Sequence, residues 1–388
     1  MDVQMDSSPP AALPHASIPK GAIPDVSIIV PARNEEASLG ACLESLTAQT
    51  GLAFEIIVVD DGSTDRTRAI AQSFAGVQVI STDPRRENSV GKTCTTENWT
   101  GKNNAVIAGA KEARAKWLLF TDADTVHQPG SLARALTEAR VERADLLSYS
   151  PEQAVVTFAE RAVMPVIFAE LARQYPLHKV RQRNSGVAAA NGQYILVRRA
   201  AYDAVGGHAA VATEILEDVA LARLFHKAGH RVYFRYGGDA VRTRMYRNWA
   251  QLCEGWTKNL ALLFPHPEWR ALQSIFVWLL AWAALIVAAS GAASRHFVWI
   301  AFAAVWLFAY RRIRGAHFTT PNNLIAIAFG LPIFANLLLR SRMAYAKGQV
   351  SWKGRAYNIG APSGSSPAKT QVAKPPSRIE SQKLRTEN

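Results

Sequence analysis

The feature that most constrains this chain of 388 residues is a run of 24 residues without a charged side chain, from Ala271 to Ser294. A helix needs about 20 apolar residues to cross the hydrocarbon core of a bilayer, so this run is long enough. Two further apolar runs follow it, at 296–310 and 324–339, with arginines at their edges. Because three such runs are hard to bury in a soluble domain, a buried helical core is the less favoured interpretation.

We therefore predict a membrane region over 271–340. Its expected helices lie at about 272–292 and 294–310, with a shorter segment at 323–340. Basic loops stay in the cytosol, and arginines at both outer ends of the first two runs predict a hairpin with both ends there. The third run is interrupted by Gly330 and Pro332 and precedes a basic stretch, so we expect it to dip into the membrane and return, or to lie at its surface. We therefore expect a multi-pass protein of the cytoplasmic (inner) membrane, with the globular domain that precedes the membrane region in the cytosol.

The net charge of +13 is confined to the same part of the chain. From residue 271 onward there are fourteen Lys and Arg but two acids, which accounts for +12 of the total. A pI of about 9.8 alone would raise nucleic-acid binding. Since the first two thirds are nearly neutral, the charge is better explained by loops that flank a membrane, and we expect no nucleic-acid partner.

The remaining segments follow from composition. Low hydrophobicity predicts disorder in a lead at 1–24 and in a tail at 361–388. A basic cytosolic segment is expected at 341–360, between the membrane region and the tail. The globular domain occupies 25–262, and within it a mixed apolar and charged stretch near 155–175 predicts a helix lying on the membrane surface, with core packing as an almost equal alternative.

The globular part alternates short apolar runs with amphipathic helices. Ile28-Ile29-Val30, Ile56-Ile57-Val58-Val59 and Leu118-Leu119-Phe120 are continuous apolar runs, which are typical of strands buried on both faces. The pattern predicts an α/β fold with a mostly parallel sheet and helices on both faces. Ligands of such sheets bind beyond the carboxyl ends of the strands.

Acidic residues stand at two of those strand ends. Asp60 and Asp61 end one apolar run, and Asp122 and Asp124 follow another. Gly101 and Lys102 open a helix between them, where backbone N–H groups and the ammonium favour phosphate. Each feature alone is common in turns and helix caps. Together, closely spaced carboxylates suit Mg²⁺ or Mn²⁺, which usually also holds a substrate phosphate. His127, three residues beyond, is expected to be a solvated loop side chain rather than a ligand.

At this point the chain resembles the family 2 glycosyltransferases of the GT-A fold. The resemblance runs from Ser27 to about Lys258 and rests on Ser27–Glu36, Val59–Asp65 and Asp122–Asp124. Within the family it is most similar to membrane-bound enzymes that glycosylate lipids, such as carotenoid-acid and hopene-associated glycosyltransferases. Trp99 with Gly101-Lys102, Ala189–Gln193, Val205–His208, Leu216–Val219 and Val350–Arg355 carry that similarity.

The resemblance implies a role for each matching residue. Asp218 is the general base of an inverting transfer, and Asp124 binds the metal, Mg²⁺ or Mn²⁺. A carboxylate at a helix start is held ionised by the helix field, as a base requires. Glu217, Trp256 and Trp352 are weaker candidates for acceptor binding or gating. The residues implied in nucleotide-sugar binding are Pro31, Glu35, Asp61, Lys102 and Asp122.

The implied reaction transfers a sugar from a nucleotide-diphosphate donor, with a UDP-sugar expected, to a membrane lipid. Two alternatives stay open. A processive polysaccharide synthase of the family would carry Q-x-x-R-W after the base, whereas Gln251 to Trp256 has neither that spacing nor its arginine. A catalytically inactive, membrane-anchored sugar-nucleotide-binding protein is the other alternative, against which the complete acidic set argues.

Overall fold

The computed structural model describes residues 22–82, 101–182, 185–290, 296–352 and 355–358, with side chains given up to residue 350 except at 297 and 349. Most of the expected lead, the whole tail at 361–388 and Trp99 lie outside these residues. Trp352 lies in strand β11 (Gln349–Trp352), which pairs with β12 (Arg355–Asn358), but its side chain is not among those described.

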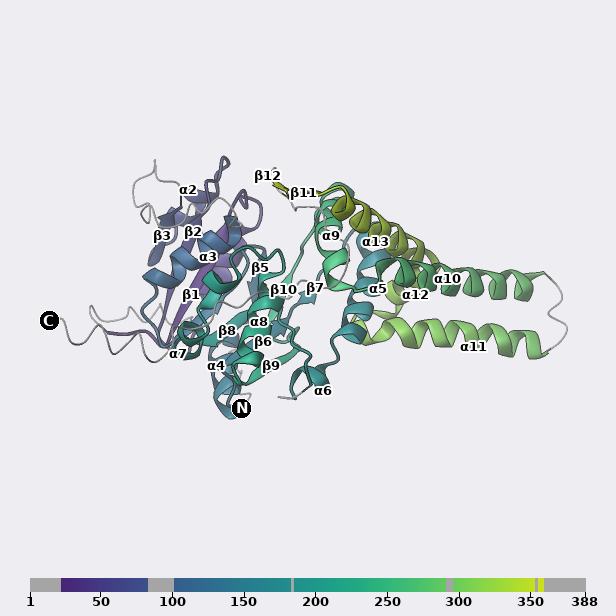
Figure 1. Cartoon of the computed structure of the whole chain (residues 1–388), viewed down its shortest axis with the longest axis horizontal. Coiled ribbons are helices and arrows are strands. Elements are labelled where there is room, and N and C mark those ends of the chain that lie inside the picture. Colours follow the sequence, from purple (N-terminus) through teal and green to yellow (C-terminus); the bar gives the residue numbers. More distant parts are fainter. Residues whose placement is uncertain (1–21, 83–100, 183–184, 291–295, 353–354, 359–388) are drawn as a thin grey trace, which may run out of the picture.

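The described residues form a central seven-stranded sheet in the order β3-β2-β1-β4-β8-β6-β9 (Figure 1). All neighbouring strands are parallel except that β8 runs against both β4 and β6. The mostly parallel α/β sheet expected from the sequence is therefore confirmed. The strands are β1 (Val26–Ala32), β2 (Phe54–Asp60), β3 (Val77–Ser81), β4 (Trp117–Phe120), β6 (Leu146–Ser150), β8 (Ile195–Arg198) and β9 (Val232–Tyr236).

Helices cover both faces of this sheet because successive strand residues point to opposite sides. Ile28 belongs to the core shared with helices α1 and α4, whereas its neighbour Ile29 belongs to the core shared with α3 and α8. Both side chains are completely buried, which explains why the strands read as continuous apolar runs. The covering helices are α1 (Leu39–Thr47), α3 (Gly101–Glu112), α4 (Ser131–Val141) and α8 (Glu217–Lys227), with α2 (Thr67–Gln72) and α7 (Arg199–Ala204) near the strand ends.

A smaller sheet of β5 (Thr125–His127), β10 (Val241–Thr243) and β7 (Glu152–Gln153) stands beside the central one. β10 leads into helix α9 (Trp249–Leu263), which begins the apolar part of the chain. Helices α10 (Pro267–Ala289) and α11 (His296–Ile313) then project together from the globular part (Figure 1). Many of their large apolar side chains are exposed, among them Trp269, Phe276, Ile286, Ile300 and Phe308.

Among the described residues, two helices are long and apolar enough to cross a membrane: Pro267–Ala289 and Thr320–Ala346. The second comprises α12 (Thr320–Ile325), a π-helical turn (Ala326–Gly330) and α13 (Leu331–Ala346). Of the two alternatives expected for this segment, a return within the membrane or a position at its surface, the first requires a break at Gly330 and Pro332 that the structure does not show. Pro332 has no N–H to donate back along the helix, and the Ala328 carbonyl instead accepts the indole N–H groups of Trp278 and Trp282 at 2.8 and 2.9 Å.

Gly330 allows this helix to lie against α5 (Phe158–Gln174). A Cβ atom at Gly330 would come within 1.9 Å of the Ala162 carbonyl oxygen, so only glycine fits this crossing. The middle of α5 is buried in a core shared with α9, α10 and α13. This stretch therefore takes part in core packing with the candidate membrane helices, and its position relative to a membrane stays a prediction.

Candidate active site

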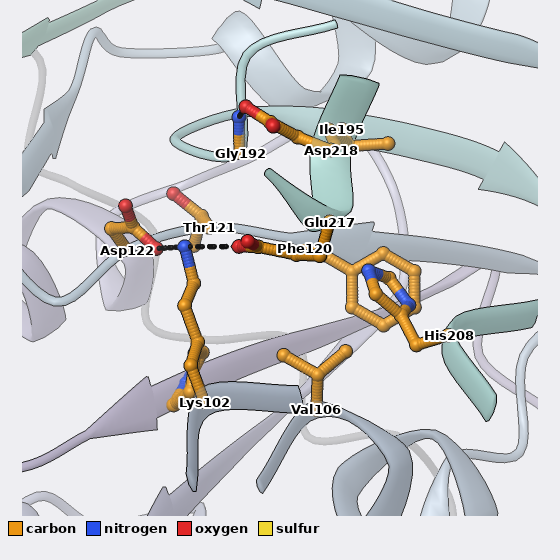
Figure 2. Close-up of a pocket in the computed structure, with 11 residues that line it drawn as sticks. Lys102, Val106, Phe120, Thr121, Asp122, Gly192, Ile195, His208, Glu217 and Asp218 are labelled. Carbon is orange, nitrogen blue, oxygen red and sulfur yellow. Dashed lines mark hydrogen bonds and ion pairs between the residues drawn. The ribbon is translucent and has the colours of Figure 1, made fainter. Parts of the chain in front are cut away.

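The carboxyl ends of β1, β2 and β4 meet the turn before β8 and the start of α8 at one edge of the sheet. Lys102, in the first turn of α3, stands at the centre (Figure 2). Its Nζ lies 2.9 Å from Asp122 Oδ1 and 2.9 Å from Glu217 Oε1. Although burial lowers the pKa of Lys102, these two carboxylates raise it well above its usual range. Lys102 is therefore a permanent cation that joins the ends of β4 and α8.

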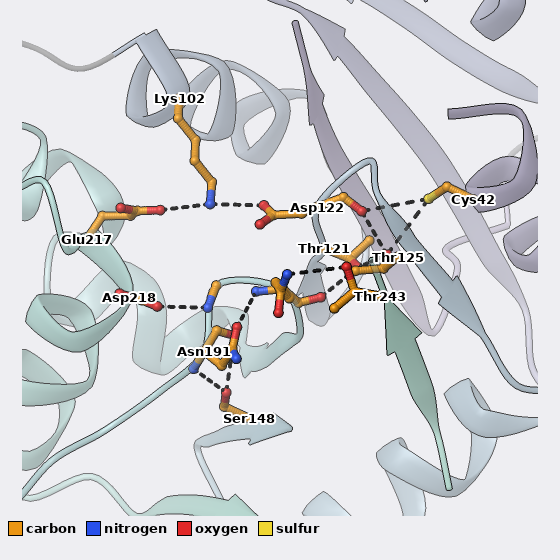
Figure 3. A network of polar contacts seen from close by, with 12 residues as sticks. Cys42, Lys102, Thr121, Asp122, Thr125, Ser148, Asn191, Glu217, Asp218 and Thr243 are labelled. Atoms are coloured by element: carbon orange, nitrogen blue, oxygen red, sulfur yellow. Dashed lines mark hydrogen bonds and ion pairs between the residues drawn. The ribbon is translucent and has the colours of Figure 1, made fainter. Parts of the chain in front are cut away.

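Asp218 lies on the other side of the turn before β8. Its Oδ2 accepts a hydrogen bond from the Gly192 N–H at 2.9 Å (Figure 3), and its Oδ1 accepts one from the Val219 N–H at 2.8 Å. Burial and the adjacent Glu217 carboxylate raise the pKa of Asp218 to about 6. Burial alone would also raise the pKa of Glu217, but Lys102 and Lys258 lower it. The pKa of Asp218 is thus raised while that of its neighbour Glu217 is lowered. Asp218 can therefore act as a base while Glu217 stays ionised in its ion pair with Lys102.

The two aspartates at the end of β2 have different surroundings and different roles. Asp60 is completely buried, accepts the Ser63 N–H at 2.9 Å and stabilises the turn. Asp61 lines the cavity and accepts the Thr82 hydroxyl at 2.9 Å. Pro31 and Glu35, after β1, line the same cavity, as the resemblance implies for the donor site.

Asp124 lines the cavity together with Asp122. In the part of the chain that the structure describes, no group of three or more His, Cys, Asp or Glu side chains is arranged to hold a metal ion. Two carboxylates facing a cavity nevertheless fit Mg²⁺ or Mn²⁺, because these ions are commonly held by one or two carboxylates, with water and substrate phosphate completing the shell. The carboxylates of Asp122 and Asp124 therefore suit a divalent metal ion that binds together with the diphosphate of a nucleotide.

Two histidines near the site are structural. His127 is not a solvated loop residue, as the sequence led us to expect: it is buried in β5, with Nε2 3.1 Å from the Thr121 hydroxyl, and burial lowers its pKa to about 3. His208 is also buried, lies 3.0 Å from the Tyr202 hydroxyl and packs edge-on against Phe120. Burial lowers the pKa of His208 to about 4, so both imidazoles are neutral near pH 7.

Helix α9 brings two more residues to the cavity. Trp256 is buried, and its indole N–H contacts Met164 Sδ at 3.4 Å, so it is not a side chain exposed at the membrane surface. Lys258 faces the charged cluster; burial lowers its pKa, and Glu217, Asp218 and Asp122 oppose that effect. Sequence analysis missed Lys258 because it matches no motif. No local pattern marked Lys258, because it reaches the cavity only through the packing of α9.

These residues face one cavity of about 970 Å³. The polar end holds the carboxylates and Lys102, and the cavity continues between α5, α9 and the chain that follows α11. All the sequence-predicted site residues whose side chains are described line it: Pro31, Glu35, Lys102, Asp61, Asp122, Asp124, Glu217, Asp218 and Trp256. Its volume is at the upper end of the range usual for ligand sites, which leaves space for two substrates.

Comparisons with known proteins agree with this picture. Residues 27–164 match the family described as Glycosyl transferase family 2. A 4,4'-diaponeurosporenoate glycosyltransferase from Staphylococcus aureus strain MRSA252 is 27% identical over 353 residues, covering 86% of this chain and 88% of the relative. The protein of the same name from strain USA300 is 26% identical over the same coverage.

Solved structures were also found. A mannosyltransferase from Pyrobaculum calidifontis in complex with GDP-Man and Mn²⁺ is 15% identical, with a TM-score of 0.44, and the match covers 87% of this chain and 90% of that one. The S. aureus protein TarS, residues 1–349 with UDP-GlcNAc, is 16% identical, with a TM-score of 0.38 and coverage of 87% and 98%.

The mostly parallel α/β sheet, the match over residues 27–164 and the named relatives identify the chain as a glycosyltransferase enzyme of the GT-A fold class. Residues 27–164 form a domain that matches glycosyltransferase family 2. The resemblance seen in the motifs is thereby confirmed.

Proposed function

We propose that the chain transfers a sugar from a nucleotide-diphosphate donor, with uridine as the expected base, to a membrane lipid, and inverts the anomeric centre. The observation that carries this proposal is the joining of Asp122 and Glu217 by Lys102, with Asp218 beside them in a single cavity. The names of the S. aureus relatives, which specify 4,4'-diaponeurosporenoate, support an apolar acceptor.

Asp218 acts as the general base in this proposal. Its carboxylate is oriented by the Gly192 and Val219 N–H groups and takes the proton of the acceptor hydroxyl. The acceptor oxygen then forms a bond to the anomeric carbon, while the bond from that carbon to the diphosphate oxygen breaks and its electron pair leaves with the diphosphate. Lys102 and Lys258 supply positive charge near the departing group. No covalent enzyme intermediate is required.

We expect Asp124 to hold Mg²⁺ or Mn²⁺. Asp122, which lies beside it, is expected to bind the sugar-nucleotide. When bound, the cation supplies positive charge to the diphosphate oxygens and stabilises their release. Removal of divalent ions with EDTA should abolish transfer, and Mn²⁺ or Mg²⁺ should restore it. Full activity in EDTA would contradict the metal assignment.

The decisive experiment compares lipids from cells that express the wild-type chain, Asp218→Asn or Asp203→Asn. Asp203 is an exposed residue of α7 and serves as the matched control. Mass spectrometry should show lipids heavier by one sugar with the wild type and with Asp203→Asn, and about a hundredfold less with Asp218→Asn. UDP binding by calorimetry should remain in all three proteins. Wild-type cells without glycosylated lipid would refute the function, and transfer by Asp218→Asn above about a hundredth would refute the base.

The proposed location is the cytoplasmic membrane, which the chain crosses more than once with its catalytic domain in the cytosol. The exposed apolar surfaces of α10 and α11 and the basic residues at the ends of these helices next to the globular part (Figure 1) support this orientation. A cysteine introduced by Lys353→Cys should react with an impermeant maleimide after permeabilisation but not in intact cells. Labelling from outside, above that of the parent chain, would contradict the orientation.

A further inference from the structure

Part of the cavity wall is apolar. Phe168 and Leu171 of α5, Trp256 and Leu263 of α9, and Phe318 belong to it, although polar residues such as Asn259 and Thr319 line the cavity as well. Phe168 packs edge-on against both Trp256 and Phe318, with ring centroids 6.1 Å apart in each pair. These three aromatic side chains therefore form one continuous apolar surface in the cavity wall.

Residues 315–319, which follow α11, supply a further part of the cavity wall. After α11 ends at Ile313, a short turn leads to His317, whose φ of 62° places it in the left-handed region. The His317 ring stacks on Tyr236, at the end of β9, with ring centroids 3.9 Å apart and an angle of 8° between planes. This stack holds segment 315–319 against the catalytic domain, and every residue of that segment lines the cavity.

The arrangement suits a molecule with one reactive polar end and one long apolar chain. The polar end of the cavity holds Asp218, which requires the acceptor oxygen within hydrogen-bond reach. Helices α5 and α9, which supply most of the apolar wall, lie between the sheet domain and α10 and α11 (Figure 1), whose exposed apolar surfaces are suited to lipid.

We propose that the part of the cavity lined by α5, α9 and segment 315–319 binds the apolar chain of the acceptor. Phe168 and Phe318 are the residues that determine which apolar chains are accepted. This inference rests on the proposed lipid acceptor and assigns that acceptor's chain to particular residues. The His317–Tyr236 stack positions the wall and does not contact the reacting atoms.

The test uses the full chain in phosphatidylcholine nanodiscs and a photoactivatable hexadecanol that carries a diazirine in its chain. Ala172 is exposed on α5 and lines the cavity, so Ala172→Trp narrows the cavity without disturbing the protein core. Ala69→Trp on α2, also exposed but away from the cavity, is the matched control. After irradiation, adducts are located by peptide mass spectrometry.

We expect the wild type and Ala69→Trp to carry adducts on α5 and on segment 315–319, displaced by unlabelled hexadecanol but not by hexanol. Ala172→Trp should reduce these adducts about tenfold and leave UDP binding unchanged. Adducts absent from both regions in the wild type, or unchanged by Ala172→Trp, would overturn the inference. Neither result would contradict the proposed transferase function. That function is contradicted separately, if wild-type cells make no glycosylated lipid.

Discussion

The carboxylate of Asp218 lies 2.9 Å from the backbone nitrogen of Gly192, and this contact fixes the candidate base against the turn before β8. A Cβ atom at Gly192 would stand 3.2 Å from Lys102 Nζ and 3.6 Å from Asp218 Oδ2. Glycine therefore lets the main chain pass between the cation and the base. The turn orients Asp218 while Lys102 remains engaged with Asp122 and Glu217.

The first prediction concerns pH. Because the proposed base works only when ionised and the pKa of Asp218 is about 6, kcat/KM should be constant above that pH and fall about tenfold per unit below it. Stability should move the other way. Asp218 ionises in the unfolded chain near its ordinary value of 3.8, so between about pH 4 and 6 the folded chain holds more protons and loses stability as pH rises.

Transfer rates and urea midpoints measured across pH 4 to 8 test both statements. Asp218→Asn should flatten the stability profile between about pH 4 and 6, because it removes the group that titrates there. A rate profile without a change near pH 6, or an unchanged stability profile in the Asn variant, would contradict the assignment.

The second prediction concerns Lys258. Replacing it with methionine removes a cation near Glu217 and Asp218, so the pKa of Asp218 should rise and the midpoint of the rate profile should move to higher pH. Loss of one charge-assisted contact should also weaken UDP-sugar binding about tenfold to a hundredfold. Lys227→Met, at the exposed end of α8, is the control and should change neither quantity. A purely structural Lys258 would leave the pH midpoint in place.

Part of this site could be predicted from the sequence because its acidic residues directly follow the apolar strands. Buried strands read as apolar runs, and whatever polar residue ends a run must lie at the edge of the sheet, as Asp61 and Asp122 do. Lys258 and Phe318 could not be found this way. They reach the cavity only through the packing of α9 and the turn after α11, which no local pattern encodes. His127 shows the converse: its burial depends on β10 pairing with β5, a contact between distant segments.

The third prediction concerns the crossing of α5 and the C-terminal helix. Gly330→Ala would place a methyl group against the Ala162 carbonyl, where the distance to an added Cβ is 1.9 Å. The helices must separate, which should destabilise the chain by about 1–3 kcal/mol. Gly40→Ala is the control, because nothing lies within 4 Å of its added Cβ in the first turn of α1, and it should raise stability slightly. Thermal unfolding of the full chain in detergent measures both, and equal midpoints would contradict the packing argument.

The last prediction concerns Glu170, a carboxylate only 1% exposed in α5. It pairs with Arg173 of the same helix, with Arg270 of α10 at 2.8 Å and with Arg312 of α11 at 2.9 Å. Although burial alone would raise the pKa of Glu170, Arg173 and Arg312 lower it. Glu170 therefore joins α5 to the ends of α10 and α11 that lie next to the globular part (Figure 1).

Glu170→Gln leaves three arginines together without their shared anion, and breaking a buried pair in this way typically costs about 3–5 kcal/mol. Glu268→Gln breaks the exposed pair with Arg342, which is also 2.8 Å long, and should cost about 1 kcal/mol or less. The two variants remove the same charge, so the difference between their unfolding midpoints reports burial. Because the ion pairs need an ionised Glu170, whose pKa is lowered in the folded chain, its contribution should vanish as pH falls through that pKa. Similar midpoints at neutral pH would mean that the projecting helices are held by apolar packing instead.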